Sequence, residues 1–306
     1  MEKRTNPRDV NSCYGTIGPS QDAVDMFFMG NGLAINDPNS GYDETGFSAV
    51  ENHCYDPDYK DKKTDQNISN MYANREPRFY ASVVYQGRSW FKKWMNGNPN
   101  YIVDFSAGGG NDLSNGDNVK TGYMLGKFKN RTVNHASGDT QSWKRVSIIY
   151  RLAEFYLFYA EALNETDPSN PDIIKYIDMV RERAGIPGYQ TMNDNGIKTG
   201  IIGNYDKQFD AIQHERYVEL YCEGQRYFDI RRWMICGDKD RIGCDQTRFY
   251  GMNMKGSKDK TPGEPTSYYT RTKVENRQWT DKLYLYPIHQ NVIELANGRI
   301  PQNYGW

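Results

Sequence analysis

The spacing of hydrophobic and polar positions changes partway along the chain. From residue 148 onward, apolar side chains recur at intervals of three and four, which is the period of an amphipathic α-helix. The first stripe consists of Ile148, Leu152, Phe155, Tyr159 and Leu163. The second stripe consists of Ile173, Ile174, Ile177 and Val180. Pro168 and Pro171 lie between the two stripes, so the pattern predicts two helices joined by a short turn, as an antiparallel hairpin.

A hairpin of this kind is similar to one tetratricopeptide-type unit. Ala153 and Ala160 are small residues inside its first helix, and they allow the partner helix to approach closely. Units of this type bury both of their faces only when they stack against neighbours. The hairpin alone therefore leaves one apolar face to be covered by another element.

A third long helix is predicted over residues 205–233. Its candidates for burial are Phe209, Ile212, Leu220 and Phe228. Gly224 lies in the interior of this helix, where glycine costs about 1 kcal/mol relative to alanine. A glycine at this place indicates either close backbone packing or a break in the helix.

The first 145 residues have a different pattern, rich in turn-forming residues. Three strands are predicted, over residues 79–86, 101–105 and 122–128. The fold class that follows is mainly α, with tetratricopeptide-like helical hairpins, long irregular loops and a few short β-strands.

Composition and charge narrow the classes of function. The 306 residues include 38 Lys and Arg against 39 Asp and Glu, and a net charge of −1 argues against a general nucleic-acid binder. Hydrophobic residues make up only 37%, but aromatic residues reach 14%, whereas disordered chains are poor in aromatics. No run of 18 apolar residues is present to span a bilayer, and residues 1–10 lack an apolar export signal. The sequence indicates a folded, loop-rich protein with many half-buried rings.

The sequence contains few residues of the types that bind metals or cofactors. Five cysteines show no C-x-x-C spacing and four histidines are scattered, so no disulfide framework, zinc site or cofactor is expected. His214 and Glu215 begin like the zinc motif H-E-x-x-H, but Val218 stands at its last position. No catalytic site is visible in these patterns.

Three carboxylates, Glu215, Glu219 and Glu223, share one helical face because they are spaced by four. Two close carboxylates are the machinery of glycoside hydrolases, but carboxylates that rise together on one helix seldom straddle a bond. Arg226 and Arg232 lie close enough in sequence to form ion pairs or to cap carbonyl groups. We interpret this segment as a structural ion-pair helix.

One cluster is typical of a ligand-binding surface. Residues 85–101 place aromatic rings among polar and turn-forming residues rather than in a long apolar run. Rings presented from a loop stack on the flat faces of sugars, while amides and basic side chains reach hydroxyl groups. The alternative is that these rings cover the core beneath a long loop. The candidate glycan-binding residues are Trp90, Phe91, Lys93, Trp94, Asn96 and Tyr101.

Several segments resemble the SusD/RagB family, and they occur in the family's order. Residues 151–164 (RLAEFYLFYAEALN) resemble its signature R-L-A-E-x-Y-L-x-Y-A-E-A-x-N, and residues 214–233 resemble E-R-R-x-E-L-x-x-E-G-x-R-F-x-D-L-x-R-W. Residues 75–79 (REPRF) resemble R-D-P-R-F. Residues 285–290 and 302–306 resemble the tail motifs L-x-P-I-P-x-x-E and Q-N-P-G-Y/W.

The resemblance implies a largely helical, non-catalytic surface lipoprotein of Bacteroidetes-type bacteria that binds glycans or other nutrients. Such a protein is held at the outer membrane by a lipid anchor and caps a SusC-like, TonB-dependent transporter. The motifs match the C-terminal portion of the family, so residues 1–306 are interpreted as one SusD/RagB C-terminal domain. Within it we expect a loop-rich ligand-facing part (1–145), a helical part (146–235) and a region of loops and tail (236–306).

The resemblance also implies what the sequence lacks. The family's export signal, lipid-bearing cysteine and early repeats are missing, and no apolar stretch precedes Cys13 to make it the lipidated residue. Without the early repeats the hairpin lacks its stacking partners, so we expect exposed apolar helix surface.

Three functions from different classes compete. The leading hypothesis is binding of oligosaccharides or polysaccharides and their delivery to a transporter, without catalysis. The alternative is a tetratricopeptide-type scaffold that binds a peptide or protein, which aromatic side chains on a helical face would favour. The third is a glycoside hydrolase that uses two of the three glutamates.

Overall fold

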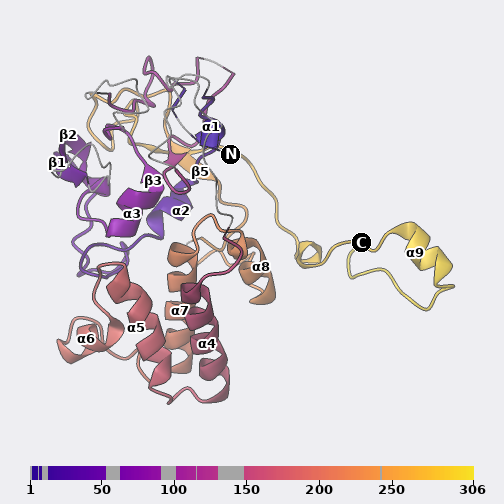
Figure 1. Ribbon diagram of the computed structural model, residues 1–306. Coiled ribbons are helices and arrows are strands. Elements are labelled where there is room, and N and C mark those ends of the chain that lie inside the picture. The colour runs from indigo at the N-terminus through magenta and orange to yellow at the C-terminus, as the bar shows by residue number, and fades with distance from the viewer. Residues whose placement is uncertain are drawn as a thin grey trace.

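The computed structural model describes residues 2–5, 7–8, 13–52, 63–90, 101–114, 116–129, 148–241 and 243–306. Its helices are α1 (Glu2–Thr5), α2 (Gln21–Asp25), α3 (Pro77–Ser82), α4 (Leu152–Thr166), α5 (Asp172–Arg183), α6 (Tyr189–Asp194), α7 (Tyr205–Glu219), α8 (Gln225–Arg232) and α9 (Gln290–Leu295), with 3₁₀ turns η1 (Asn70–Tyr72) and η4 (Asp281–Tyr284). The described strands form antiparallel pairs: β1 (Phe47–Asn52) with β2 (Lys63–Ser69), β3 (Val83–Val84) with β4 (Met124–Leu125), and β5 (Tyr250–Met252) with β6 (Arg271–Lys273). A loop-rich part lies above a helical part formed by α4 to α8 (Figure 1). This architecture confirms the predicted fold class.

The helical part is built on α4, α5 and α7. The predicted stripe of α5 is buried, and it packs in one core with Leu157 of α4 and Ile212 of α7. Ala160 is fully buried and Ala153 packs against the same core, as their small size predicts. The hairpin of α4 and α5 is therefore confirmed.

The first helix of the hairpin buries a different face from the one predicted. Leu152, Phe155 and Tyr159 are 62%, 56% and 47% exposed. The buried residues of α4 are Glu154, Leu157, Ala160, Glu161 and Asn164. Three of these five are polar, and each has a hydrogen-bond partner in or beside α7 or α8. The inward face of α4 is thus selected by specific polar partners. Leu152, Phe155 and Tyr159 of the stripe face outward, whereas Leu163 packs against the core.

The single helix predicted over residues 205–233 is two helices in the structure. α7 ends at Glu219, and α8 begins after Gly224, whose φ of 96° lies in the left-handed region that glycine adopts without strain. The glycine therefore marks a break, which was one of the two interpretations. Ile212 and Leu220 are buried as predicted, but the prediction for Phe228 is wrong, because the break rotates α8 and leaves this ring 67% exposed.

The prediction of one strand over residues 79–86 is only partly right, since this segment begins inside α3 and becomes the short strand β3. Pro77 lies in the first turn of α3, where its missing N–H removes no helical hydrogen bond. β3 pairs with β4, which lies inside the strand predicted at 122–128. The propensity of β-branched and aromatic residues for strands is overridden here by a proline-started helical turn.

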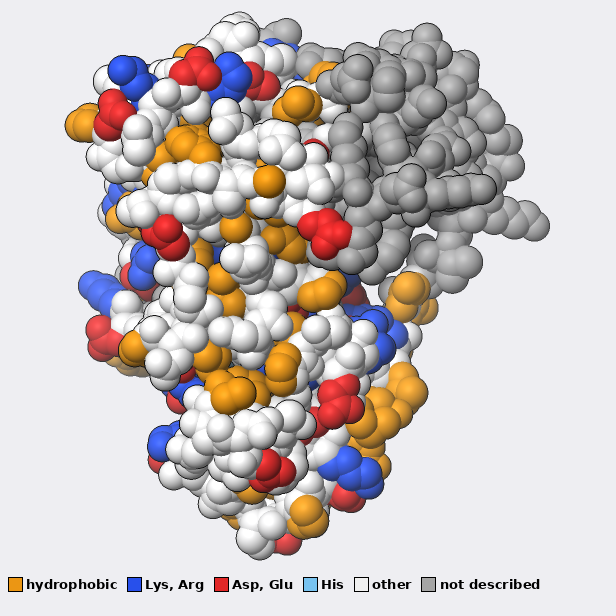
Figure 2. Space-filling view, turned by 90° about the vertical axis from the view of Figure 1, so that its left-hand side faces the viewer, with side chains coloured by type: hydrophobic (Ala, Val, Ile, Leu, Met, Phe, Trp, Pro, Cys, Tyr) orange, Lys and Arg blue, Asp and Glu red, His pale blue; other side chains and the backbone are white. Residues whose placement is uncertain are grey.

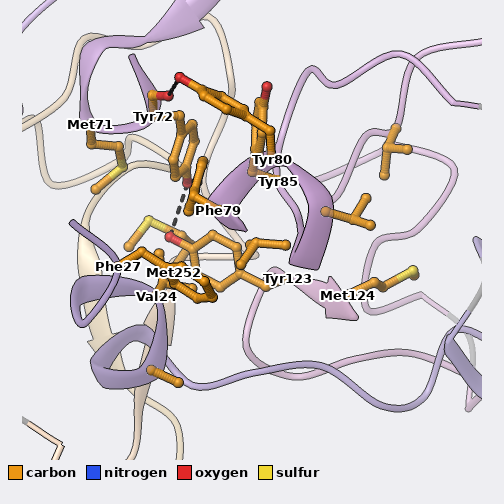
Figure 3. Close-up of a cluster of buried hydrophobic side chains, with 14 of the residues drawn as sticks. Val24, Phe27, Met71, Tyr72, Phe79, Tyr80, Tyr85, Tyr123, Met124 and Met252 are labelled. Atoms are coloured by element: carbon orange, nitrogen blue, oxygen red, sulfur yellow. Dashed lines mark hydrogen bonds between the residues drawn. The ribbon is translucent and has the colours of Figure 1, made fainter. Parts of the chain in front are cut away.

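Aromatic side chains form the core of the loop-rich part (Figure 3). The Tyr72 ring stacks on Tyr85 and Phe79 with centroids 4.8 and 6.2 Å apart. The hydroxyl groups of Tyr72 and Tyr123 lie 3.0 Å apart, and Tyr123 donates to Gln21 Oε1 at 2.6 Å. These rings are fully buried, and the hydroxyl groups of Tyr72 and Tyr123 remain hydrogen-bonded, which lets a chain with few aliphatic residues build a dry core.

The surface carries mixed charge and some exposed apolar side chains. On the face shown in Figure 2, acidic and basic side chains are interspersed, and hydrophobic side chains gather along the edge of the helical half. The C-terminal tail, with η4 and α9, extends away from both parts (Figure 1). Leu295 and Tyr304 in this tail are 84% and 82% exposed.

Candidate functional site

The segment predicted to bind a glycan is joined to the protein by a short hairpin stem. Val103 N donates to Arg88 O at 2.9 Å, and Trp90 N donates to Tyr101 O at 3.1 Å. Residues 91–100 connect the two sides of this stem. Four of the predicted ligand-binding residues lie outside the described residues, namely Phe91, Lys93, Trp94 and Asn96.

Trp90 and Tyr101 anchor the two ends of this stem. Trp90 is only 2% exposed and belongs to the core of the loop-rich part. Tyr101 is partly buried against the same core, and its hydroxyl accepts from Asn111 Nδ2 at 3.1 Å. The burial of Trp90 favours, for this ring, the alternative that it covers the core.

The three glutamates of the predicted ion-pair helix meet basic residues from other elements. Glu215, whose side chain is fully buried, lies 2.5 Å from Arg78 and 3.3 Å from Arg181. Glu219 lies 2.9 Å from Arg78 and also contacts Arg151. We call Glu215, Glu219, Arg78 and Arg181 the Glu215 cluster. It joins α3 of the loop-rich part to α5 and α7 of the helical part.

The basic partners keep the carboxyl groups of Glu219 and Glu223 ionised. Burial opposes the ionisation of Glu219, but Arg78 and Arg151 outweigh it, so the pKa of Glu219 lies below its ordinary value. Burial is likewise outweighed at Glu223, where hydrogen bonds from Arg151 and Lys127 lower the pKa. A general acid needs a raised pKa, and neither carboxyl group has one. The arrangement is that of ion pairs that hold two parts of a structure together.

The arginines that follow on α8 have other partners. Arg226 Nη2 donates to the carbonyl of Gly243 at 2.7 Å. Arg232 Nη2 donates to Glu161 at 2.7 Å, and Arg232 Nε donates to Asp229 at 2.9 Å. Nearness in sequence therefore did not identify the partners of the glutamates, because these come from distant segments of the chain.

A hollow of about 400 Å³ opens where the loop-rich and helical parts meet. α7 contributes Asp210, Gln213 and His214 to its wall. The loop-rich part and the segments from α8 onward contribute Asp25, Met26, Ala34, Asn36, Arg226, Asp238, Asp240 and Arg241. The volume lies in the range of small-molecule sites, about 300–1,000 Å³. We call this cavity the His214 hollow.

His214 is held in one orientation at the edge of this hollow. Its ring stacks on Phe28 with centroids 4.1 Å apart, and its Nε2 lies 2.6 Å from the carbonyl oxygen of Met26. A carbonyl oxygen only accepts, so Nε2 carries the proton and Nδ1 is the acceptor of the neutral ring. Burial lowers the pKa of His214 to about 4, and the ring is uncharged at neutral pH.

A second hollow of about 670 Å³ adjoins the first. The residues that line both are Ala34, Asn36, Asp210 and His214. Its floor is apolar, with Leu33, Tyr189 and Met192 buried there. At its rim Lys198 lies 2.6 Å from Asp37. The two hollows form a continuous recess along one side of α7.

Sequence reasoning did not find this recess. His214 entered only as the start of an incomplete zinc motif, and no pattern marked Gln213 or Arg226 as lining residues. The wall is assembled from segments near residues 25–36, 210–214, 226 and 238–244, which are separated by long stretches of chain. Only tertiary structure brings them together.

The described part of the chain shows neither a metal-binding cluster nor a membrane-spanning helix. No described group of His, Cys, Asp and Glu is arranged to hold a metal ion. None of the described helices is both long enough and apolar enough to cross a bilayer.

The fold defines a class of protein in which a repeat-like helical part supports a loop-rich part with an aromatic core. The family model described as the SusD family matches residues 1–306 of the sequence. The chain therefore belongs to the SusD family, as its motifs predict.

Several known proteins are similar to this chain. SusD-like protein P2 of Formosa agariphila is 37% identical over 82 residues, which is 27% of this chain and 16% of that protein. A solved SusD-like protein of Bacteroides fragilis is 26% identical with a TM-score of 0.68, and the solved protein BT4246 is 24% identical with a TM-score of 0.76. Each match covers 99% of this chain and 50% of the solved chain. The chain thus spans half the length of these solved relatives.

Proposed function

We propose that the protein binds oligosaccharide or polysaccharide nutrients at the bacterial cell surface, without catalysis, and delivers them to a SusC-like, TonB-dependent transporter. The observation that carries the proposal is the match of the whole chain to the SusD family. Localisation at the outer membrane, through a lipid anchor, belongs to the same proposal. The net charge of −1 is compatible with uncharged glycan ligands.

The binding surface that we propose is the segment 91–100 together with Tyr101. The stem at Trp90 and Tyr101 is fixed in the core, which favours a segment presented from a rigid base. Phe91 and Trp94 would stack on sugar rings, and Lys93 and Asn96 would bond hydroxyl groups.

The ion pairs of Glu215 and Glu219 favour a glycan-binding protein over a glycoside hydrolase. Glu215 and Glu219 each contact more than one arginine, and their oxygens are occupied by these partners. A glycoside hydrolase needs one carboxylic acid that is protonated and one carboxylate that is free to act on the sugar. The ion pairs leave neither group available for these roles.

The test is a fluorescence titration of the purified chain with a panel of neutral soluble polysaccharides. We expect a saturable change in tryptophan emission with one glycan class, and a loss of affinity of about tenfold or more in Trp94→Ala. Trp306→Ala is the matched control, because this ring lies in the tail and should leave the affinity unchanged. A flat response from folded protein to every polysaccharide would contradict the proposal.

One observation favours a second function, a scaffold that binds a helical protein segment. Leu152, Phe155, Phe158 and Tyr159 form an exposed apolar face on α4. Aromatic side chains on a helical face suit an amphipathic helix as the partner. In this case Phe155→Ser would weaken binding to the protein partner, and Trp94→Ala would not.

A further inference from the structure

Two residues that line the His214 hollow carry buried hydrogen-bond donors without acceptors among the described residues. Gln213 is 4% exposed, and its Oε1 accepts from Arg241, which fixes the orientation of the amide. Gln213 Nε2 is buried and has no hydrogen-bond partner among the described residues. Arg226 Nε is buried and equally unpartnered within that part of the chain. Unpaired buried donors are costly, so these two nitrogens point to an acceptor that a ligand would supply.

The same hollow is rich in acceptors. The carboxylates of Asp25, Asp210, Asp238 and Asp240 line it together with the guanidinium groups of Arg226 and Arg241. Arg241 pairs with Asp210 at 2.8 Å and lies 3.6 Å from Asp238. Asp240 forms no ion pair with any described residue, so its carboxylate is available to a ligand. Asp25 is paired with Arg271, which does not line the hollow, so three carboxylates remain against two guanidinium groups and the balance is negative by one charge.

These two features restrict the chemistry of the occupant. A cation would pair with the carboxylates but leave the donors of Gln213 and Arg226 unsatisfied. An anion would satisfy the donors but meet an excess of negative charge. A hydroxyl group donates and accepts at once, and it satisfies both sets.

The wall also offers a surface for the carbon skeleton of a sugar. Met26 and Ala34 contribute apolar atoms to the lining. His214 also lines the hollow, and Nδ1 of its neutral ring is an acceptor. A ring with hydroxyl groups on its edge and C–H groups on its faces matches this distribution.

We infer that the His214 hollow binds an uncharged, polyhydroxylated ring, namely a hexose unit or the terminal hexose of an oligosaccharide. The inference deepens the proposed function and rests on it for the class of ligand. It adds a binding position built from α7, α8 and the segment 25–36, separate from the stem at Trp90 and Tyr101.

The experiment is saturation-transfer NMR on the full chain with methyl glycosides of glucose, galactose and mannose at millimolar concentration. Glucosamine and glucuronate serve as a cationic and an anionic probe of similar size. We expect saturable binding of at least one methyl glycoside, and weaker binding of both charged probes. Absence of saturable binding for all three methyl glycosides, or tighter binding of either charged probe, would overturn the inference.

Variants connect the signal to the hollow. Gln213→Glu keeps the acceptor for Arg241 and removes the unpartnered donor, so the Kd of the methyl glycoside should rise about tenfold or more. Gln278→Glu adds the same charge at an exposed position and is the matched control. Asp240→Asn changes an exposed rim carboxylate that holds no described ion pair, so it tests the hollow even where Gln213→Glu fails to fold. Unchanged affinity in a folded Gln213→Glu or Asp240→Asn variant would overturn the assignment.

The outcome is independent of the polysaccharide titration. If methyl glycosides bind in the hollow but polysaccharides give no fluorescence response, the proposed uptake function fails and this site stands. If polysaccharides bind through Trp94 while no methyl glycoside binds, the hollow fails and the proposed function stands.

Discussion

At the scale of the residue, the position of His214 decides its charge. Stacking on Phe28 and burial at the junction of the two parts remove water from the ring, which opposes protonation. The hydrogen bond to Met26 O favours the protonated form but does not offset the loss of hydration, so the pKa falls from 6.5 to about 4. The folded protein therefore keeps this ring neutral at pH values where the unfolded chain protonates it.

This difference predicts a pH dependence of stability. Between pH 6.5 and about 4 the unfolded state binds a proton at His214 and the folded state does not, so stability falls as the pH falls. The contribution of His214 at pH 5 should be a loss of roughly 2 kcal/mol in the free energy of unfolding. Urea unfolding at pH 7, 6 and 5 measures it, with His214→Gln as the reference that cannot titrate but can still donate to Met26. If the free energy of unfolding changed equally with pH in the unmodified protein and in His214→Gln, the prediction would be refuted.

At the scale of the element, the Glu215 cluster connects helices that the sequence separates. Arg78 belongs to α3, Arg181 to α5 and Glu215 to α7. Arg181 also lies between the rings of Phe28 and Tyr189, at 4.7 and 4.1 Å from their centroids, and donates to the carbonyl of Gly32 at 2.7 Å. Removing one charge from such a buried group leaves the others without compensation.

Glu215→Gln should therefore be strongly destabilising. The amide has nearly the same shape but leaves Arg181 without its buried counter-charge, while Arg78 keeps Glu76 and Glu219. We expect a loss of about 3–5 kcal/mol in the free energy of unfolding. Urea unfolding at pH 7 measures the loss. Glu182→Gln on the exposed side of α5 is the control and should leave stability unchanged. A cost for Glu215→Gln as small as that of the control would show that the cluster is not a connection between the two parts.

The sequence predicts well those elements in which the buried residues are the apolar ones. The stripe of α5 is apolar and buried, so its helical period was sufficient. α4 was predicted as a helix but with the wrong face inward, because Glu161 and Asn164 are buried by partners on or beside α7 and α8. The same limit applies to the sites. The aromatic cluster around Trp90 was visible as a local pattern, whereas the His214 hollow depends on contacts between distant segments.

At the scale of the whole molecule, α4 and the extended tail both expose large apolar side chains to solvent. Repeat-type helical units bury both faces by stacking, and the chain spans half the length of its solved relatives. Tyr150, Leu152 and Phe155 are each more than half exposed, and so are Leu295 and Tyr304 in the tail. The exposed face of α4 agrees with the expectation of exposed apolar helix surface.

The exposed face predicts that the chain binds a hydrophobic dye. Dye fluorescence should exceed that of a compact globular protein of the same size, because large contiguous apolar patches are rare on stable monomers. The double variant Leu152→Glu and Phe155→Lys should lower the signal without lowering the free energy of unfolding, since both side chains are exposed. The control variant is Leu157→Ala, at a buried position of the same helix. It should instead lower the free energy of unfolding by about 2–5 kcal/mol. Dye binding that stays at the control level, or that is unaffected by the double variant, would mean that the α4 face is not the apolar surface available to a partner.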